Sequence, residues 1–326
     1  MKTSEVYNTL FHYTNSKGLL GILRSQSLWA THYKFLNDYS ELSLFRTILH
    51  HALRLPVKTQ FDEIINRNPN VKKLIESDGG INAVIDHDIS VTIDTLYNFI
   101  AQEIYISSFC GEHPDDQYIN DHGLLSQWRG YGDDGGFALV FRTKSIEDML
   151  EIEADCYDYN FGYVTDLIYS DDESRFVSEM VDEISKLCDY IRKLFEAMKL
   201  NDDEAPDAGE AALAFLKCIG RYKHRGFKEE NEVRILAGPN LHDDEFLTLA
   251  ENEQVTLKPE KVRRMRDGEN FQVPYIELFG LWGRDLPIER IIVGPHRDKK
   301  RRAASLRTML AKTGIYVTVS DIPFAG

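Results

Sequence analysis

The strand-like runs of this chain are irregularly spaced, and that spacing limits the folds it can adopt. Helical stretches of very different length separate the runs, so the regular alternation of strand and helix that builds a doubly wound parallel sheet is missing. The sequence predicts an α+β fold with a mixed, mainly antiparallel sheet core. Its strands are expected at residues 10–14, 28–33, 104–109, 137–141, 162–169, 232–237, 271–279, 288–293 and 315–319.

Capping residues and apolar spacing locate the helices. The first helix is expected to begin at Asn15 or Ser16, and the second to begin at Asn37 or Asp38 and end before Pro56. We expect residues 1–326 to form one domain, with residues 171–225 as a helical insertion within it. The further helical patterns cover residues 57–100 with breaks at 68–69 and 79–80, residues 171–200 as one amphipathic helix, residues 210–222 after a polar linker at 201–209, and residues 299–312.

Composition indicates a soluble protein. The formal net charge is −15, and 43% of the residues are hydrophobic. The apolar runs are far shorter than the roughly 20 residues needed to cross a bilayer, and no signal-peptide core follows the start, so we expect a cytoplasmic protein without a membrane partner. The four cysteines include no Cys-x-x-Cys pair and are expected to be reduced, namely Cys110, Cys156, Cys188 and Cys218.

Positive charge is concentrated in the C-terminal third. From Lys217 onward there are 20 basic and 16 acidic residues (20 − 16 = +4), and before it 18 basic and 37 acidic (18 − 37 = −19). The basic runs are either solvated helix ends and loops or a patch that follows the phosphates of a nucleic acid. If the acceptor is a nucleic acid, the predicted contacts are Arg263, Arg264, Arg266, Arg301 and Arg302.

A glycine-rich segment, Gly130-Tyr131-Gly132-Asp133-Asp134-Gly135, has the formal spacing G-x-G-x-x-G. A dinucleotide-binding loop of that spacing follows a strand and opens a helix, whereas a strand is predicted after this one. Two aspartates would also repel phosphate. We therefore interpret the segment as a tight turn that leads into the strand at Phe137.

A second candidate site lies in the segment 227–235. If it is one strand, Glu230, Glu232 and Arg234 point to one face while Val233 and Ile235 point to the core. This face is either a solvated edge or a site in which a fixed carboxylate stabilises a cationic transition state.

His12 is a third candidate because it lies near the end of the first strand, with Tyr13 and Thr14 after it. A structural histidine is the alternative. The polar loop with His113, Asp115, Asp116, Asp121 and His122 has no established metal-ligand spacing, so we expect a solvated loop and no metal. The chain also lacks the G-x-S-x-G, P-loop and H-E-x-x-H motifs.

Several segments together resemble the bacterial domain-of-unknown-function family twenty-nine seventy-one. The resemblance covers nearly the whole chain outside the helical insertion, but the activity of that family is not established. The segments that carry it are Phe11-His12-Tyr13-Thr14, Leu28-Trp29-Ala30-Thr31, Phe35-Leu36-Asn37-Asp38 with Glu41, Ile106-Ser107-Ser108-Phe109, Leu125 to Asp133, Phe227 to Arg234, and Ile292-Val293-Gly294-Pro295.

A more distant resemblance is to ADP-ribosyltransferases, which have a histidine on a first strand, a serine or tyrosine on a middle strand and Glu-x-Glu on a late strand. It implies an ADP-ribosyltransferase-like fold with NAD as the substrate and no metal. Glu232 would be the catalytic carboxylate and Glu230 would orient the acceptor. The implied NAD-binding residues are His12 at the ribose, Ser107 and Ser108 beside it, Trp128 or Tyr131 against nicotinamide, and Tyr13, Thr14 and Arg234 nearby.

The resemblance implies an ADP-ribosyltransferase that modifies a protein, RNA or DNA, acting as a toxin or phage-defence effector with an antitoxin or regulatory partner. Two alternatives stay open. An NAD glycohydrolase would use water as the acceptor, and a non-catalytic nucleotide-sensing module would bind without turnover. The transferase interpretation requires His12 and Glu232 to face one cleft, so side chains on opposite faces of the sheet would defeat it.

Overall fold

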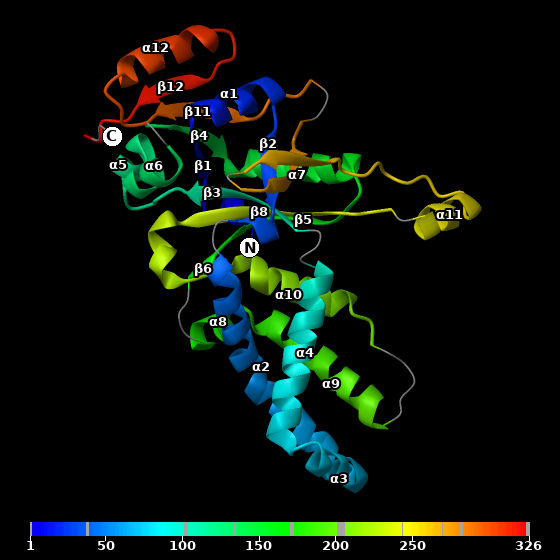
Figure 1. Cartoon of the computed structure of the whole chain (residues 1–326). Coiled ribbons are helices and arrows are strands. Elements are labelled where there is room, and N and C mark those ends of the chain that lie inside the picture. Colours follow the sequence, from blue (N-terminus) through cyan, green and yellow to red (C-terminus); the bar gives the residue numbers. More distant parts are fainter. Residues whose placement is uncertain are drawn as a thin grey trace. The chain divides into compact units, whose positions relative to one another are not determined.

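The structure is a computed structural model that describes residues 2–36, 39–100, 104–132, 135–169, 173–200, 206–242, 244–268, 270–280 and 283–323. The chain forms two compact units (Figure 1). The first unit comprises residues 1–35, 103–166 and 228–326, and the second comprises residues 36–102 and 167–227. Each unit is therefore assembled from segments that are distant in the sequence.

The first unit is built on a mixed sheet of ten strands among the described residues, which confirms the predicted α+β class. All the strand regions predicted for this unit are present. The basic strand β9 was not predicted, because the run Arg263–Asp267 shows no apolar alternation. The strands are β1 (Thr9–Thr14), β2 (Leu28–His32), β3 (Tyr105–Gly111), β4 (Phe137–Arg142), β5 (Tyr159–Asp166), β8 (Glu232–Pro239), β9 (Arg263–Asp267), β10 (Gln272–Leu278), β11 (Ile288–Val293) and β12 (Tyr316–Val319).

The sheet has one continuous order with a branch at β3. Its path is β12-β11-β4-β1-β3-β2-β10-β9, and β8 pairs with both β3 and β5. The β11–β12 pair is parallel, and the other pairs of this sheet are antiparallel. The strands that contain Phe11, Ile106, Phe137, Val233 and Ile276 therefore belong to one sheet, as predicted.

Helices cover both faces of this sheet. The larger core contains residues of α1, α7 and α12, and the smaller one contains Trp128 of α6 (Figure 1). The Asn15 side chain accepts a hydrogen bond from the Gly18 N–H at 2.9 Å, which confirms Asn15 as the cap of α1. The helices of the first unit are α1 (Ser16–Ser25), α5 (Gln117–His122), α6 (Leu125–Tyr131), α7 (Thr143–Cys156), α11 (Asp244–Asn252) and α12 (Lys299–Met309), with short 3₁₀ turns at Thr3–Glu5, Tyr33–Phe35 and, across the boundary between the units, Arg225–Glu230.

The second unit is helical, with one short strand pair, β6 (Ile168–Tyr169) and β7 (Tyr222–Lys223). Two predictions for its helices are corrected. The helix expected to end before Pro56 continues through it, and the single helix expected over residues 171–200 is two helices that meet at Met180. The predicted caps Asn37 and Asp38 and the linker residues 201–205 lie outside the described residues. The helices are α2 (Tyr39–Arg67), α3 (Pro69–Ser77), α4 (Ile81–Ile100), α8 (Glu173–Glu179), α9 (Val181–Leu200) and α10 (Gly209–Arg221).

Aromatic packing holds this helical unit together. The Phe61 ring of α2 stacks on the Phe195 ring of α9 with centroids 4.0 Å apart, and Phe45 meets Phe215 of α10 at 5.6 Å. Such burial stabilises α2 enough to offset the missing hydrogen bond at Pro56. The helices predicted as an insertion thus share a core with α2 and α4, which end more than seventy residues earlier in the chain (173 − 100 = 73).

Two predictions that followed from composition can be compared with this structure. No helix among the described residues is both long and apolar enough to cross a membrane. All four cysteines are free thiols, and Cys110, Cys188 and Cys218 are buried. Burial raises the pKa of the Cys188 thiol to about 12, so it stays protonated at neutral pH.

Candidate functional site

Three neighbouring strands, β1, β3 and β8, bring together the segments that the sequence singled out. On one edge of β3, β8 pairs along its length, with Ser108 opposite Arg234 and Cys110 opposite Glu232. On the other edge, β2 pairs only as far as Ile106, and β1 pairs only from Cys110 onward. Between those two points, this edge of β3 has no partner among the described strands.

His12 occupies this gap between β1 and β2. Its Nδ1 lies 3.0 Å from the backbone oxygen of Ser108, and its ring centroid is 5.4 Å from that of Phe109. A carbonyl oxygen can only accept, so Nδ1 carries the proton and Nε2 is left as an acceptor. Burial lowers the pKa of His12, which keeps the imidazole neutral at neutral pH.

This lowered pKa predicts a pH dependence of stability. The unfolded chain protonates His12 below about pH 6.5, whereas the folded chain resists protonation, so stability falls as the pH drops from there to the lowered pKa. His12→Asn keeps a donor for Ser108 and should reduce that fall, whose slope for one group is at most about 1.4 kcal/mol per pH unit. Urea unfolding of both proteins at pH 7 and pH 5 measures it. An unchanged difference between the two pH values would contradict the prediction.

His113 also contributes to the pH dependence of stability and is unchanged in the His12→Asn protein. Burial lowers its pKa as well, so a smaller pH dependence should remain in the His12→Asn protein.

Glu232 and Arg234 form a buried ion pair at the start of β8. Arg234 Nε donates to Glu232 Oε1 at 2.8 Å, and Nη2 donates to Oε2 at 3.2 Å. Only 8% of the Glu232 side chain and 4% of the Arg234 side chain are exposed. The solvated-edge alternative is therefore wrong, and the guanidinium holds both carboxylate oxygens in a fixed plane.

Glu230 does not lie beside Glu232. It ends the 3₁₀ turn Arg225–Glu230, and the next residue, Asn231, has a positive φ of 44° that turns the chain before β8 begins. The Asn231 side chain fixes this turn, because its amide donates to the carbonyls of Gly111 and Glu112 at 3.2 and 3.0 Å. The prediction that Glu230 and Glu232 lie side by side on one strand is thus wrong, because Asn231 turns the chain between them. The sequence pattern gave no sign of this turn.

The strand register assigns the predicted residues to two faces of the sheet. Directly opposed residues of paired strands point to the same side, so Glu232 shares a face with Cys110 and Phe11, and His12 alternates to the other face. Val233 and Ile235 lie in the larger core, as predicted. The prediction that His12 and Glu232 face one cleft and contact a single ribose is therefore wrong, because the strand register places them on opposite faces.

The two serines of β3 also divide between the faces. Ser108 is exposed on the Glu232 face. Ser107, opposite Ile235, is on the His12 face and 1% exposed, and its buried hydroxyl has no hydrogen-bond partner among the described residues. A buried hydroxyl without a partner is uncommon in folded proteins.

The predicted stacking residue Trp128 is a core residue in this structure. It is fully buried, its ring meets Tyr13 edge-on at 4.8 Å, and its Nε1 donates to the His122 carbonyl at 3.0 Å. Gly123 and Gly294 lie so close to the indole that a Cβ on either would approach it to 2.5 and 2.8 Å. Trp128 has no face left for nicotinamide in this conformation.

The other aromatic candidates differ in exposure. Tyr131 is 47% exposed, whereas Tyr13 is buried and its hydroxyl accepts a hydrogen bond from the Leu124 N–H at 2.9 Å. Burial raises the pKa of Tyr13, so it stays un-ionised. Thr14 ends β1 and is half-buried. Of these residues, Tyr131 presents the largest exposed ring surface.

The glycine-rich segment is the turn that the sequence predicted. Its first residues end α6, and β4 follows at Phe137, so no helix opens after it. Gly135 and the adjacent Gly136 have φ of 96° and 51°, a conformation that favours glycine. Asp133 and Asp134 lie outside the described residues.

The five arginines predicted to hold an acceptor do not form one patch. Arg302 donates to Ser16 Oγ at 3.0 Å and lies over the Phe137 ring, while the Arg301 side chain is 90% exposed on α12. On β9, residues 264 and 266 alternate with Arg263, which points to the other face. Strand alternation and local partners separate these side chains, and their contact with a nucleic-acid acceptor stays a prediction.

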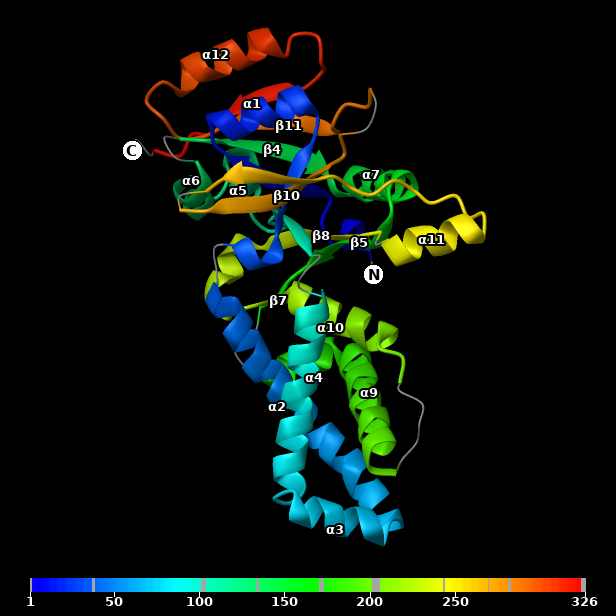
Figure 2. The same cartoon turned by 45° about the vertical axis from the view of Figure 1, so that its right-hand side comes forward.

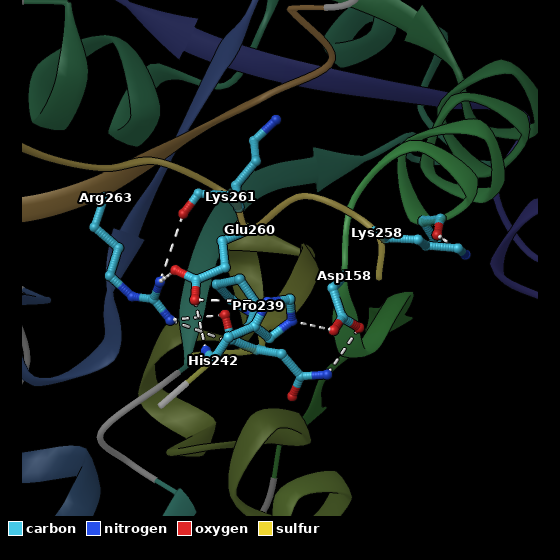
Figure 3. Close-up of polar contacts among 9 residues, drawn as sticks. Asp158, Pro239, His242, Lys258, Glu260, Lys261 and Arg263 are labelled. Carbon is cyan, nitrogen blue, oxygen red and sulfur yellow. Dashed lines mark hydrogen bonds and ion pairs between the residues drawn. The ribbon is translucent and has the colours of Figure 1, made fainter. Parts of the chain in front are cut away.

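Arg263 belongs to a polar cluster that the sequence did not indicate. It donates to the Pro239 carbonyl at 3.1 Å, and its guanidinium lies 3.9 Å from Glu260 (Figure 3). The backbone N–H of His242 donates to Glu260 at 2.5 Å, and His242 Nε2 lies 2.6 Å from Asp158. Sequence reasoning had no signal for it, because its members come from three separate segments.

The cluster fastens the segment after α11 to the ends of β5 and β8. Burial raises the pKa of Asp158, but hydrogen bonds from His242 and Asn240 outweigh this and lower it overall. The His242 side chain is only 7% exposed. This burial and the complete set of local partners indicate a structural role.

The described residues show no group of possible metal ligands, and no residue of the predicted site lines either of two hollows in the second unit. The described residues include no group of three or more His, Cys, Asp or Glu placed to hold a metal ion. In the polar loop, Asp116 caps α5 and Asp121 pairs with Arg290 at 3.3 Å. Two hollows of about 520 and 350 Å³ lie in the second unit, lined respectively by His50, His51, Arg54, Leu55, Lys58 and Asp86, and by Asp78, Ala83, Val84, His87, Asp88, Phe195, Met198 and Lys199.

Comparison with known proteins gives a family match over part of the chain. No curated protein and no solved structure matches the chain. The stretch from Gln127 to Ile235, about a third of the chain, runs from α6 into β8 and includes Trp128, Glu232 and Arg234, but neither His12 nor β3. Over these residues, 127–235, the chain matches the model of a family described as protein of unknown function (DUF2971).

Proposed function

We propose that the protein is an NAD-dependent ADP-ribosyltransferase in which a single carboxylate, that of Glu232, stabilises the positive charge of the transition state. The placement on opposite faces excludes the form of this assignment in which His12 and Glu232 share one ribose, so the proposal uses Glu232 without His12. The observation that carries it is the position of Glu232 on β8 beside β3, whose exposed Ser108 lies on the same face. These are two of the strand positions that the resemblance to ADP-ribosyltransferases assigns to NAD. The carboxylate at the start of β8 is held in a fixed orientation, as electrostatic stabilisation of a transition state requires.

The reaction needs no metal. The bond between the nicotinamide nitrogen and C1 of its ribose breaks, nicotinamide leaves with the electron pair, and positive charge develops on the ribose. A nucleophilic oxygen or nitrogen of the acceptor then bonds to C1 and loses its proton. Glu232 stabilises the developing positive charge in this proposal, and the exposed Ser108 beside Arg234 contacts the ribose.

His12 receives a different role from the one that the resemblance implies. It lies on the opposite face from Glu232 and bonds to the Ser108 backbone, so it acts as a positioning residue that fixes β3 where β1 and β2 separate. NAD consumption by a toxin or phage-defence effector, in the cytoplasm where NAD is available, is the biological role that this chemistry would serve.

A second candidate is a non-catalytic nucleotide-binding module. Arg234 engages both oxygens of Glu232, and this pair is shielded from solvent, as in an ion pair that only stabilises the fold. The placement of His12 and Glu232 on opposite faces removes the shared ribose site that the transferase resemblance implies.

Incubation with adenylate-labelled NAD distinguishes these functions. The protein and the labelled NAD are added to whole-cell extract, and the products are digested separately with protease and nuclease. Label on a macromolecule indicates transfer, free ADP-ribose indicates an NAD glycohydrolase, and binding of NAD without consumption indicates the module. If no NAD is consumed with any extract or on its own, the transferase proposal is wrong.

Glu232→Asp tests the carboxylate while leaving a negative charge beside Arg234. The substitution shortens the side chain by one methylene group and so displaces the carboxylate by about 1 Å. A misplacement of about 1 Å can lower the rate roughly 100-fold. We expect NAD consumption to fall by about that factor. The measurement is initial-rate nicotinamide release at saturating NAD.

Glu153→Asp is the matched control, because Glu153 is another buried glutamate of the first unit, paired with Lys261. It should lower stability without lowering the rate per folded molecule. Equal rates in the Glu232→Asp and wild-type proteins would remove Glu232 from the mechanism.

A further inference from the structure

A partly exposed face of the sheet carries aromatic and guanidinium groups side by side. Trp29 and Arg264 are exposed on it, whereas Thr31 and Tyr275 are buried. In the antiparallel segment β2-β10-β9, Thr31 lies opposite Tyr275, and Tyr275 lies opposite Arg264. Alternation places Trp29 and Arg266 on the same face. The opposite face contributes Leu28, Ala30, Ile276 and Leu278 to the larger core. We name the group Trp29, Thr31, Arg264, Arg266 and Tyr275 the aromatic–arginine face.

Trp29 is both exposed and held in place. Its ring lies 4.5 Å from the Tyr275 ring, and the Arg266 guanidinium is 5.7 Å from the indole. Arg266 is itself fixed, because its Nη2 donates to Thr31 Oγ1 at 3.0 Å. Trp29 nevertheless remains 43% exposed. A rigid indole with free surface on a strand is suited to stacking against a planar ligand.

Positive charge lies at the outer strand of the same face. The Arg264 side chain is 51% exposed, and its Nε is 3.5 Å from Glu277. Glu277 lies opposite Trp29, so it faces the same side and offsets part of that charge. β9 is the last strand on this side of the described sheet, and Figure 2 shows it beside β10.

We infer that the aromatic–arginine face binds single-stranded nucleic acid, with one base stacked on Trp29 and a phosphate at Arg264. Sheet-borne aromatics that stack unpaired bases beside backbone-contacting cations are a general means of binding single strands. An acidic peptide would use the arginine but not the exposed indole. Bases in a duplex are already stacked on one another and leave no ring for Trp29.

The size of the face and the net charge of the chain limit this interaction. Two gaps of about 4.8 Å separate the three strands, so the face has room for about two nucleotides. The net charge of −15 opposes a long polyanion. Binding should therefore involve a short stretch of strand and only one or two phosphates.

Binding to this face does not require NAD chemistry, and the inference goes beyond the proposed function. Only the identification of the bound strand as the acceptor rests on that function. Failure of the two ideas is distinguishable, because strand binding is measured without NAD and NAD consumption is measured without nucleic acid.

The test measures the affinity of the full chain for fluorescent ten-nucleotide oligo(dT) and oligo(U) by anisotropy at several salt concentrations. We expect log affinity to fall with log salt with a slope of about −0.7 to −1.4, as for one or two released counterions on a single strand. The mononucleotide, a duplex of the same length and a ten-residue acidic peptide serve as competitors.

Trp29→Ala should weaken oligonucleotide binding by roughly 5- to 150-fold, the loss expected for one stacked base, and Trp29→Phe should restore most of it. Tyr316→Ala is the matched control, because Tyr316 is 74% exposed on β12 of the same unit and should not affect binding. Melting temperatures of the three variants establish that each one folds.

Substitutions of Arg264 and Glu277 should change the affinity for the oligonucleotide in opposite directions. Arg264→Gln should weaken binding and make the salt slope shallower by about 0.7. Glu277→Gln should strengthen binding, because it removes the negative charge beside Arg264. Arg142→Gln is the control, because the Arg142 side chain is 69% exposed at the end of β4 and pairs with Glu289; it should leave affinity unchanged.

The inference is supported if the oligonucleotide binds with this salt slope and Trp29→Ala and Glu277→Gln shift affinity in opposite directions. It is overturned if no oligonucleotide binds, if Tyr316→Ala weakens binding as much as Trp29→Ala, or if the mononucleotide, the duplex or the acidic peptide binds as tightly as the single strand.

Discussion

Replacement of Glu232 with glutamine is expected to lower the free energy of unfolding by about 3–5 kcal/mol. Glu232 engages both Nε and Nη2 of Arg234, and the pair is almost completely buried. Glutamine removes the negative charge that pairs with the buried guanidinium. Urea unfolding at pH 7 measures the change.

The double variant Glu232→Gln, Arg234→Gln is the control for this prediction. Replacing both partners of a buried ion pair by neutral groups is often far less costly than removing one, so the double variant should recover much of the lost stability. If Glu232→Gln loses less than about 1 kcal/mol, the pair is not buried in the folded protein as described.

This stability effect determines how activity measurements are to be interpreted. A loss of NAD consumption in Glu232→Gln would combine unfolding with any loss of catalysis. Glu232→Asp keeps the charge beside Arg234, and rates expressed per folded molecule separate the two effects. The identity of the charged group in the proposed function is therefore tested with aspartate rather than with glutamine.

Trp128→Ala is expected to destabilise the protein by about 3–5 kcal/mol, as large-to-small substitutions of buried aromatics do. The indole is fully buried against Tyr13, and its loss would leave a cavity and an unsatisfied His122 carbonyl. Thermal and urea unfolding measure the effect. Trp128→Phe, which keeps most of the ring volume, should cost less.

Trp29→Ala is the informative comparison for Trp128→Ala, since Trp29 is 43% exposed. Its effect on stability should be much smaller. If Trp128 stacked on nicotinamide, Trp128→Ala would instead raise the KM for NAD and leave the unfolding free energy nearly unchanged, which would contradict the structural role assigned to it.

Periodicity in the sequence predicted local structure well where one pattern dominated. The alternating or wholly apolar runs around Phe11, Ile106, Phe137, Val233 and Ile276 are all strands of one sheet. Each run has a side-chain period that only one backbone conformation can bury. The strand β9 was missed because residues 263–267 are basic and have no apolar face of their own.

Residues that usually end a helix or a strand predicted these ends less well, because packing against distant residues determined them. Pro56 was expected to end a helix, but the buried side chains of α2 on both sides of it maintain the helix. At the start of β8, the predicted strand is shorter than expected. The sequence pattern extended it back to Glu230, but Asn231 adopts a left-handed conformation and its side chain donates hydrogen bonds to Gly111 and Glu112, which are distant in the sequence.

The sequence by itself determined the α+β class, the main strands, the cap at Asn15 and the turn before Phe137, because capping, glycine conformation and apolar period act over a few neighbouring residues. Only the tertiary structure decided which faces the candidate residues occupy. The pairing of β3 with β1, β2 and β8 places Glu232 opposite Cys110 and His12 on the other side, and it leaves Trp128 buried while Trp29 is exposed. A shift of one residue in register exchanges the two faces, and register is fixed by strands that lie far apart along the chain.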